Sequence, residues 1–92
     1  MSTSANEISR PIATTVDVDD DTITVELNDG RAISVPLSWY PRLEHATVKE
    51  RQNWELLGSG TGIDWHEVDE DISVESLIAG KPSNESQTSL RK

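Results

Sequence analysis

The chain has 92 residues, enough for one domain, and its formal net charge is −9, with 17 acidic side chains against 8 basic ones. A surface this acidic repels phosphate, so we expect neither nucleic acid nor anionic membrane as a partner. The absence of cysteine excludes disulfides and thiolate chemistry. No apolar run approaches the roughly 20 residues that span a bilayer, and the N-terminus lacks a signal-peptide pattern, so we expect a cytoplasmic protein.

Both ends of the chain are polar and poor in large apolar residues. We therefore expect residues 1–10 and 81–92 to be disordered tails around a single domain at residues 11–80. That domain has fifteen Asp and Glu against four Lys and Arg, a net charge of −11. Two readings of the charge remain open, because it either serves only solubility or matches a basic protein partner.

The first part of the domain has the pattern of β-strands. Residues 12–18 (IATTVDV) are β-branched and predict a strand. The three acids Asp19–Asp21 then predict a turn, because Asp bonds its own backbone there. They lack the spacing of a calcium loop, so we expect no metal site.

The next two strands follow directly. Residues 22–27 alternate between apolar and polar side chains, with a period of two that marks a half-buried strand. Asn28-Asp29-Gly30 is a hairpin signal, and residues 31–35 form the returning strand, which Pro36 ends. Residues 12–36 are therefore predicted to be a three-stranded antiparallel meander.

Residues 37–43 (LSWYPRL) predict a compact linker with a short helical turn after Ser38. Pro41 suits the first turn of a helix, where its missing N–H does no harm. We expect the rings of Trp39 and Tyr40 to cover the sheet. If both rings were exposed, they would instead form a binding patch.

A short helix is expected at residues 46–53 (ATVKERQN). Thr47 and Glu50 have the spacing of a capping box. We expect the basic side chains to point outward and the apolar ones inward, which assigns Lys49 and Arg51 to the surface and Ala46 and Val48 to the core.

The following residues predict a second β-hairpin. Residues 54–57 and 63–65 read as strands, and the glycine-rich residues 58–62 join them. The loop does not run into a helix and has no lysine, so it is not a phosphate-binding loop. Trp54 and Trp65 are predicted to be buried against the meander.

The end of the domain predicts a helix over residues 74–79, capped by Ser73 and stopped by Gly80. We expect the acids Asp69–Asp71 to lie just before this helix, where negative charge suits the positive end of the helix dipole.

The sequence contains no convincing catalytic or cofactor signature. His66 and Glu67 resemble half of a zinc-protease motif, but the second histidine is missing, so we expect no metal, no cofactor and no enzyme activity. His66 beside Asp69 or Asp71 leaves an alternative open, a small-ligand-binding or enzyme-like domain that uses His66 and the acids at 69–71.

Three blocks of sequence resemble one bacterial family. They are DGR-x-I-x-VPL-x-WYPRL at 29–43, AT-x-x-ER-x-x-W at 46–54, and G-x-G-I-x-W with DEDIS-x-E-x-L at 60–77. In this order they are similar to the domain of unknown function 2442, over about residues 12–80. The family usually has Gly-Ile-His-Trp-Pro where this chain has Gly62-Ile63-Asp64-Trp65-His66.

The resemblance implies a small α+β fold with no established activity or cofactor. Some members carry a further helix-turn-helix domain, and only a polar twelve-residue stretch occupies that place here. Members are often encoded beside another small protein, an arrangement similar to toxin–antitoxin pairs. We therefore expect a non-enzymatic, antitoxin-like interaction module with a small basic protein partner. Its candidate surface comprises Trp39, Tyr40, Arg42, His66, Asp69, Glu70 and Asp71.

Overall fold

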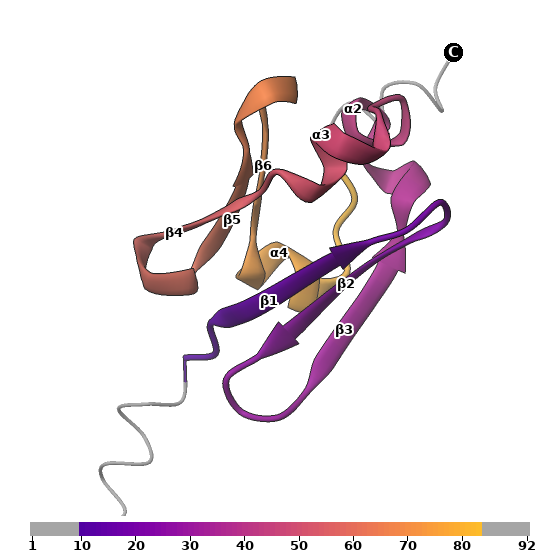
Figure 1. The fold of residues 1–92 in the computed structure, drawn as a ribbon. Coiled ribbons are helices and arrows are strands. Elements are labelled where there is room, and N and C mark those ends of the chain that lie inside the picture. The colour runs from indigo at the N-terminus through magenta and orange to yellow at the C-terminus, as the bar shows by residue number, and fades with distance from the viewer. Residues whose placement is uncertain (1–9, 84–92) are drawn as a thin grey trace, which may run out of the picture.

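The structure is a computed structural model that describes residues 10–83. Most of the two predicted tails, residues 1–9 and 84–92, lies outside the described residues. Two three-stranded antiparallel sheets, in the orders β1-β2-β3 and β4-β5-β6, are joined by short helices (Figure 1). The predicted α+β class and the meander are confirmed.

The first sheet comprises β1 (Ala13–Val18), β2 (Thr22–Leu27) and β3 (Ala32–Pro36). Alternation along β2 turns Ile23, Val25 and Leu27 into the core, with at most 4% of each exposed. Gly30 in the β2–β3 turn has φ +95°, a conformation that suits a residue without Cβ. The hairpin signal in the sequence therefore marks a real turn.

The β1–β2 turn is held by Asp19. Its Oδ1 accepts hydrogen bonds from the backbone N–H groups of Asp21 and Thr22, each at 2.8 Å. This arrangement confirms the turn predicted for Asp19–Asp21. It also explains the first of the three acids without a metal ion.

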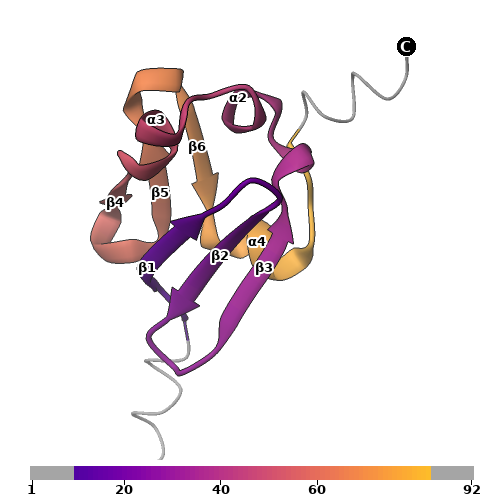
Figure 2. The same ribbon diagram turned by 45° about the vertical axis from the view of Figure 1, so that its right-hand side comes forward.

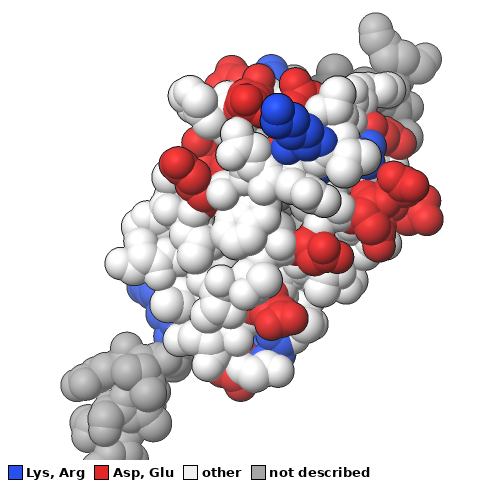
Figure 3. Space-filling view, viewed as in Figure 1, with Lys and Arg blue, Asp and Glu red and all other residues white. Residues whose placement is uncertain are grey.

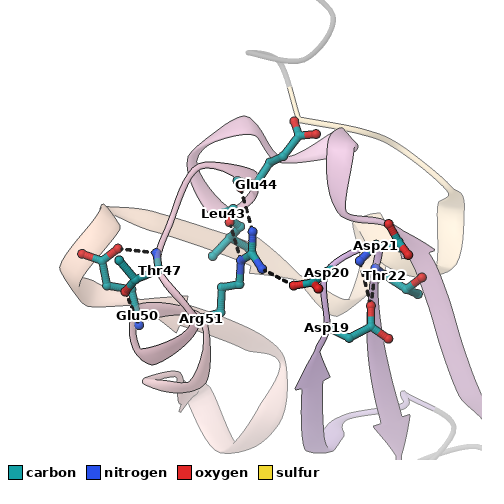
Figure 4. A network of polar contacts seen from close by, with 9 residues as sticks. All are labelled: Asp19, Asp20, Asp21, Thr22, Leu43, Glu44, Thr47, Glu50 and Arg51. Carbon is teal, nitrogen blue, oxygen red and sulfur yellow. Dashed lines mark hydrogen bonds and ion pairs between the residues drawn. The ribbon is translucent and has the colours of Figure 1, made fainter.

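Three short helical segments connect the sheets. They are the 3₁₀ helix η1 (Leu37–Trp39) and the α-helices α2 (Pro41–Glu44) and α3 (Val48–Gln52). Pro41 opens α2, and the capping box of Thr47 and Glu50 starts α3 (Figure 4). The capping box was therefore correctly predicted, although α3 is shorter than the predicted helix at both ends.

The predicted sidedness of α3 was wrong for Val48 and Arg51, although Lys49 is exposed as predicted. Val48 is 61% exposed, whereas only 11% of the Arg51 side chain is exposed. The Arg51 guanidinium turns back to donate to the carbonyls of Leu43 at 3.0 Å and Glu44 at 2.7 Å (Figure 4). A helix of five residues is oriented by such contacts more than by its own apolar pattern.

The second sheet comprises β4 (Glu55–Leu57), β5 (Gly62–Trp65) and β6 (Glu70–Ser73). The β4–β5 hairpin was predicted, and its turn is the 3₁₀ helix η2 (Gly58–Gly60). A Cβ on Gly60 would lie 2.6 Å from the Ala13 carbonyl oxygen, so this turn packs closely against the start of β1.

Strand β6 is an addition to the predicted architecture. The acids at 69–71 were expected to lie at the helix end, but Glu70 and Asp71 pair with β5 instead. Asp69 ends the 3₁₀ helix η3 (His66–Val68) in a left-handed conformation, with φ 58°. That conformation turns the chain back into β6, so Glu70 and Asp71 belong to a strand and do not lie at the start of the last helix.

The last helix, α4 (Val74–Ala79), has the predicted bounds, and the Ser73 hydroxyl accepts from the Ser76 N–H at 3.0 Å. Gly80 follows with φ 74°. In both views α4 lies beside the meander, in agreement with its contacts to β3 (Figures 1 and 2). The chain stays packed to Ser83, whose N–H donates to the Trp39 carbonyl at 3.2 Å, beyond the predicted domain end.

The core lies between the two sheets and against the linker at residues 37–43. Trp65 is fully buried, as predicted, whereas Trp54 is only partly buried against the core. The largest completely buried side chains come from both sheets and the linker: Trp65, Ile23, Leu37, Leu43 and Ile63. Between residues 10 and 83 no helix is long and apolar enough to cross a membrane.

Candidate interaction surface

The outward face of the second sheet carries three carboxylates in one row. Glu55 on β4 lies opposite Asp64 on β5, which lies opposite Asp71 on β6. The neighbouring pair Ile63 and Ile72 points to the opposite face and is buried. We call Glu55, Asp64 and Asp71 the acidic row.

The backbone pattern brings two of these acids especially close. The N–H of Val74 donates to the Thr61 carbonyl at 2.9 Å, which makes Asp64 and Asp71 a non-hydrogen-bonded pair of the ladder. In such pairs the Cα atoms are only about 4.5 Å apart. Like charges directly opposite one another destabilise a sheet, so the acidic row has a cost in the isolated domain.

Three acids elsewhere on the domain have basic partners. Arg31 pairs with Asp29 at 2.9 Å, Arg42 with Asp69 at 3.3 Å, and Arg51 with Asp20 at 3.3 Å. Within residues 10–83 the acidic row has no such ion pair.

Acidic side chains also gather elsewhere on the surface. Figure 3 shows them outnumbering basic ones on one face, with a cluster over the β1–β2 turn. The negative charge is therefore spread over several elements, and in the acidic row the carboxylates lie directly opposite one another on neighbouring strands.

The structure brings several predicted surface residues together. The Arg42 guanidinium on α2 donates to the Asp69 carbonyl at 2.9 Å and lies 3.3 Å from the Asp69 carboxylate. These contacts fix the left-handed turn that leads into β6. Trp39, one turn before α2, is partly buried against the core, so only part of its ring can contact a partner.

Tyr40 does not belong to the accessible surface, and its assignment to a binding patch was wrong. Only 3% of it is exposed, because its ring fills the core and its hydroxyl lies 3.4 Å from the Lys81 carbonyl, to which it donates. Burial, with a smaller contribution from the Glu70 charge, raises the pKa of Tyr40 to about 12. The expectation that the linker covers the sheet therefore holds for Tyr40.

A polar pocket of about 410 Å³ lies beside β6, and we call it the edge pocket. Its walls come from Tyr40, β6, α4 and the segment after α4, with Glu70, Asp71, Ser73, Ser76, Lys81 and Ser83 among the lining residues. His66 is exposed on η3 and does not line it. Among residues 10–83 no three His, Cys, Asp or Glu side chains gather in a metal-binding arrangement.

Two members of the acidic row, Glu55 and Asp64, were not predicted from the sequence. Glu55 and Asp64 are separated by the hairpin turn, and only the register of β4 with β5 places them opposite one another. The short loop at 58–61 contained that information, because loop length sets hairpin register.

Two antiparallel sheets joined by short helices, with an uncompensated acidic sheet face, define a small acidic α+β domain. The chain belongs to the family described as "Protein of unknown function (DUF2442)", whose model matches residues 13–83. The resemblance in the sequence blocks is therefore confirmed. No curated protein matches the chain.

Two solved structures share this fold. A protein of unknown function from Rhodospirillum rubrum ATCC 11170 is 28% identical, with a TM-score of 0.71 over 83% of this chain and 94% of that one. An uncharacterized protein from Chromobacterium violaceum, solved by solution NMR, is 18% identical, with a TM-score of 0.71 over 98% of this chain and 83% of that one. The second likeness concerns the fold alone.

Proposed function

We propose that this domain is a non-enzymatic, cytoplasmic interaction module that binds a small basic protein through the outward face of its second sheet. The observation that carries the proposal is the acidic row, three carboxylates aligned across all three strands without an ion pair among the described residues. In this reading the partner supplies the missing positive charge, as the toxin does in an antitoxin-like pair.

Electrostatics favours this reading over solubility alone. Solubility requires net charge but not alignment, and dispersed acids would serve it without placing Asp64 opposite Asp71. An aligned row repels itself until a cation approaches, so a basic surface gains attraction and also relieves internal repulsion. Charge of this kind acts chiefly on the association rate and on partner choice.

The surroundings of the row fit a surface that a protein can cover. Asp69, held by Arg42, and the exposed His66 lie at the η3 end of β6. Leu57, 40% exposed on β4, adds apolar area near the other side. A polar surface with a few apolar contacts is typical of non-obligate interfaces.

The proposal is tested by co-purification of the tagged protein from its native cells, with bound protein identified by mass spectrometry. We expect a small basic protein whose association rate falls between low and moderate salt while its dissociation rate changes little. Recovery of an acidic protein, or an association rate that does not respond to salt, would overturn the proposal.

A further inference from the structure

Strand β6 is one of the two edge strands of the second sheet, since the strand order is β4-β5-β6. The Val74–Thr61 hydrogen bond sets which backbone groups of β6 face β5. The backbone N–H and carbonyl groups of Glu70 and Ile72 point toward β5. The corresponding groups of Asp71 and Ser73 therefore point away from β5. The Ser73 carbonyl starts α4. Among residues 10–83 no strand pairs with the Asp71 N–H, the Asp71 carbonyl or the Ser73 N–H, so these groups are available to another strand.

The edge pocket lies along this same edge. Asp71 and Ser73 line it together with Ser76 on α4 and Lys81 and Ser83 on the far side. Figure 1 shows the yellow segment after α4 passing on the side of β6 that faces away from β5. Space next to the unpaired backbone groups is therefore open to another chain, with a volume of about 410 Å³.

We propose that the edge pocket receives an extended, basic segment of the partner protein, which adds to β6 as a fourth strand. This inference rests on the function proposed above and specifies how the partner binds. Main-chain hydrogen bonds to Asp71 and Ser73 hold the segment, in the manner of β-strand addition. Its side chain opposite Asp71 joins the acidic row as a fourth member, so a Lys or Arg there meets the uncompensated carboxylates.

The charges on β6 also favour such a partner over a second copy of this chain. Open edges are commonly protected by charged side chains, and β6 carries Glu70 and Asp71. Two β6 edges brought together would place these acids against each other. A basic segment is attracted at the same positions. The β6 edge therefore disfavours pairing with a second copy of this chain and favours pairing with a cationic strand.

The test uses the full-length, ¹⁵N-labelled protein and three synthetic peptides. The probe is acetyl-Thr-Arg-Thr-Lys-Thr-amide, whose two cations share one face of an extended chain. One control carries Glu in place of both cations. The second control keeps the cations but is N-methylated at its three central residues, which removes backbone donors while the charge stays the same.

We expect the basic peptide to shift the amide resonances of Asp71 and Ser73 and to slow their hydrogen exchange. The acidic peptide should not bind, and N-methylation should weaken binding by at least about tenfold, the factor of a 1.4 kcal/mol loss. In the protein, Asp71→Asn should weaken binding several-fold, whereas Glu26→Gln on the first sheet should leave it unchanged.

Three results would overturn strand addition: no binding of the basic peptide, equal binding of the N-methylated peptide, or shifts confined to other elements such as the β1–β2 turn. Equal, salt-sensitive binding of both cationic peptides would remove strand addition and leave the electrostatic function in place. Failure of the function itself shows instead in the native partner, as an association rate that does not respond to salt.

Discussion

The indole Nε1 of Trp65 donates a hydrogen bond to the backbone carbonyl of Arg51 at 2.9 Å. This contact ties the end of β5 to α3. Because the Arg51 side chain in turn bonds the carbonyls of Leu43 and Glu44 and pairs with Asp20, one residue connects α2, α3, the β1–β2 turn and the core (Figure 4).

Replacing Trp65 by Phe should destabilise the domain by about 1–3 kcal/mol, because the Arg51 carbonyl then loses its donor in a part-buried place. Trp65→Ala should cost more, about 3–5 kcal/mol, since a fully buried ring is deleted. Urea unfolding measures both. Trp54→Phe is the matched control, because Trp54 is only partly buried; equal losses for the two Phe variants would contradict the assigned contact.

Arg51→Ala should lower the free energy of unfolding by about 1.5–3 kcal/mol, the range for hydrogen bonds to a charged group. Arg51→Lys should recover little of it, because a single ammonium cannot reproduce the fork that meets two carbonyls. Lys49→Ala removes the same charge from an exposed position of α3 and should stay within about 0.5 kcal/mol of the wild type. Similar losses of stability for Arg51→Ala and Lys49→Ala would show that the Arg51 guanidinium does not bond the carbonyls of Leu43 and Glu44.

The stability of the domain should depend on the charge of Asp19. Hydrogen bonds from the N–H groups of Asp21 and Thr22 hold the pKa of Asp19 below its ordinary value of 3.8. A carboxyl with a depressed folded-state pKa contributes stability above its unfolded pKa, and this contribution is lost as the pH falls through the folded pKa. Between pH 7 and pH 2 the urea midpoint should therefore fall less steeply for Asp19→Asn than for the wild type. Identical slopes for the two proteins would contradict the hydrogen bonds assigned to the Asp19 carboxylate.

Much of the fold follows from local sequence rules. The β2 alternation, the Asp29-Gly30 turn, the capping box of α3 and the Ser73 cap of α4 were all predicted, because each depends on neighbouring residues. The resemblance between sequence blocks also identified the family.

Strand β6 could not be predicted in the same way. Its sequence, EDIS, has two acids that disfavour strands, and only Ile72 is buried. Pairing with β5 overrides this local preference. The role of Arg51 was missed for a related reason, since burial of its guanidinium depends on the carbonyls of Leu43 and Glu44, which lie outside its own helix.

Relief of the acidic row should stabilise the isolated domain. Asp71→Asn removes one charge from the Asp64–Asp71 pair and should raise the free energy of unfolding by about 0.2–1 kcal/mol. Glu26→Gln removes the same charge from the exposed side of β2, opposite Thr15 and Ala32, and should change stability less. Denaturant midpoints at low salt show the difference best, and a loss of stability in Asp71→Asn would mean that the row does not repel itself.

The account is tested most directly by the association rate of the native partner with the wild type, with the double variant Asp64→Asn/Asp71→Asn, and with Glu26→Gln, across a range of salt. The Debye length is about 10 Å at 0.1 M and 30 Å at 0.01 M, so the wild-type rate should fall steeply over that interval. The double variant should associate more slowly and respond less to salt, although it is the more stable protein, while Glu26→Gln should follow the wild type. Equal rates and equal salt dependence for the wild type and the double variant would contradict the claim that the acidic row is the binding surface.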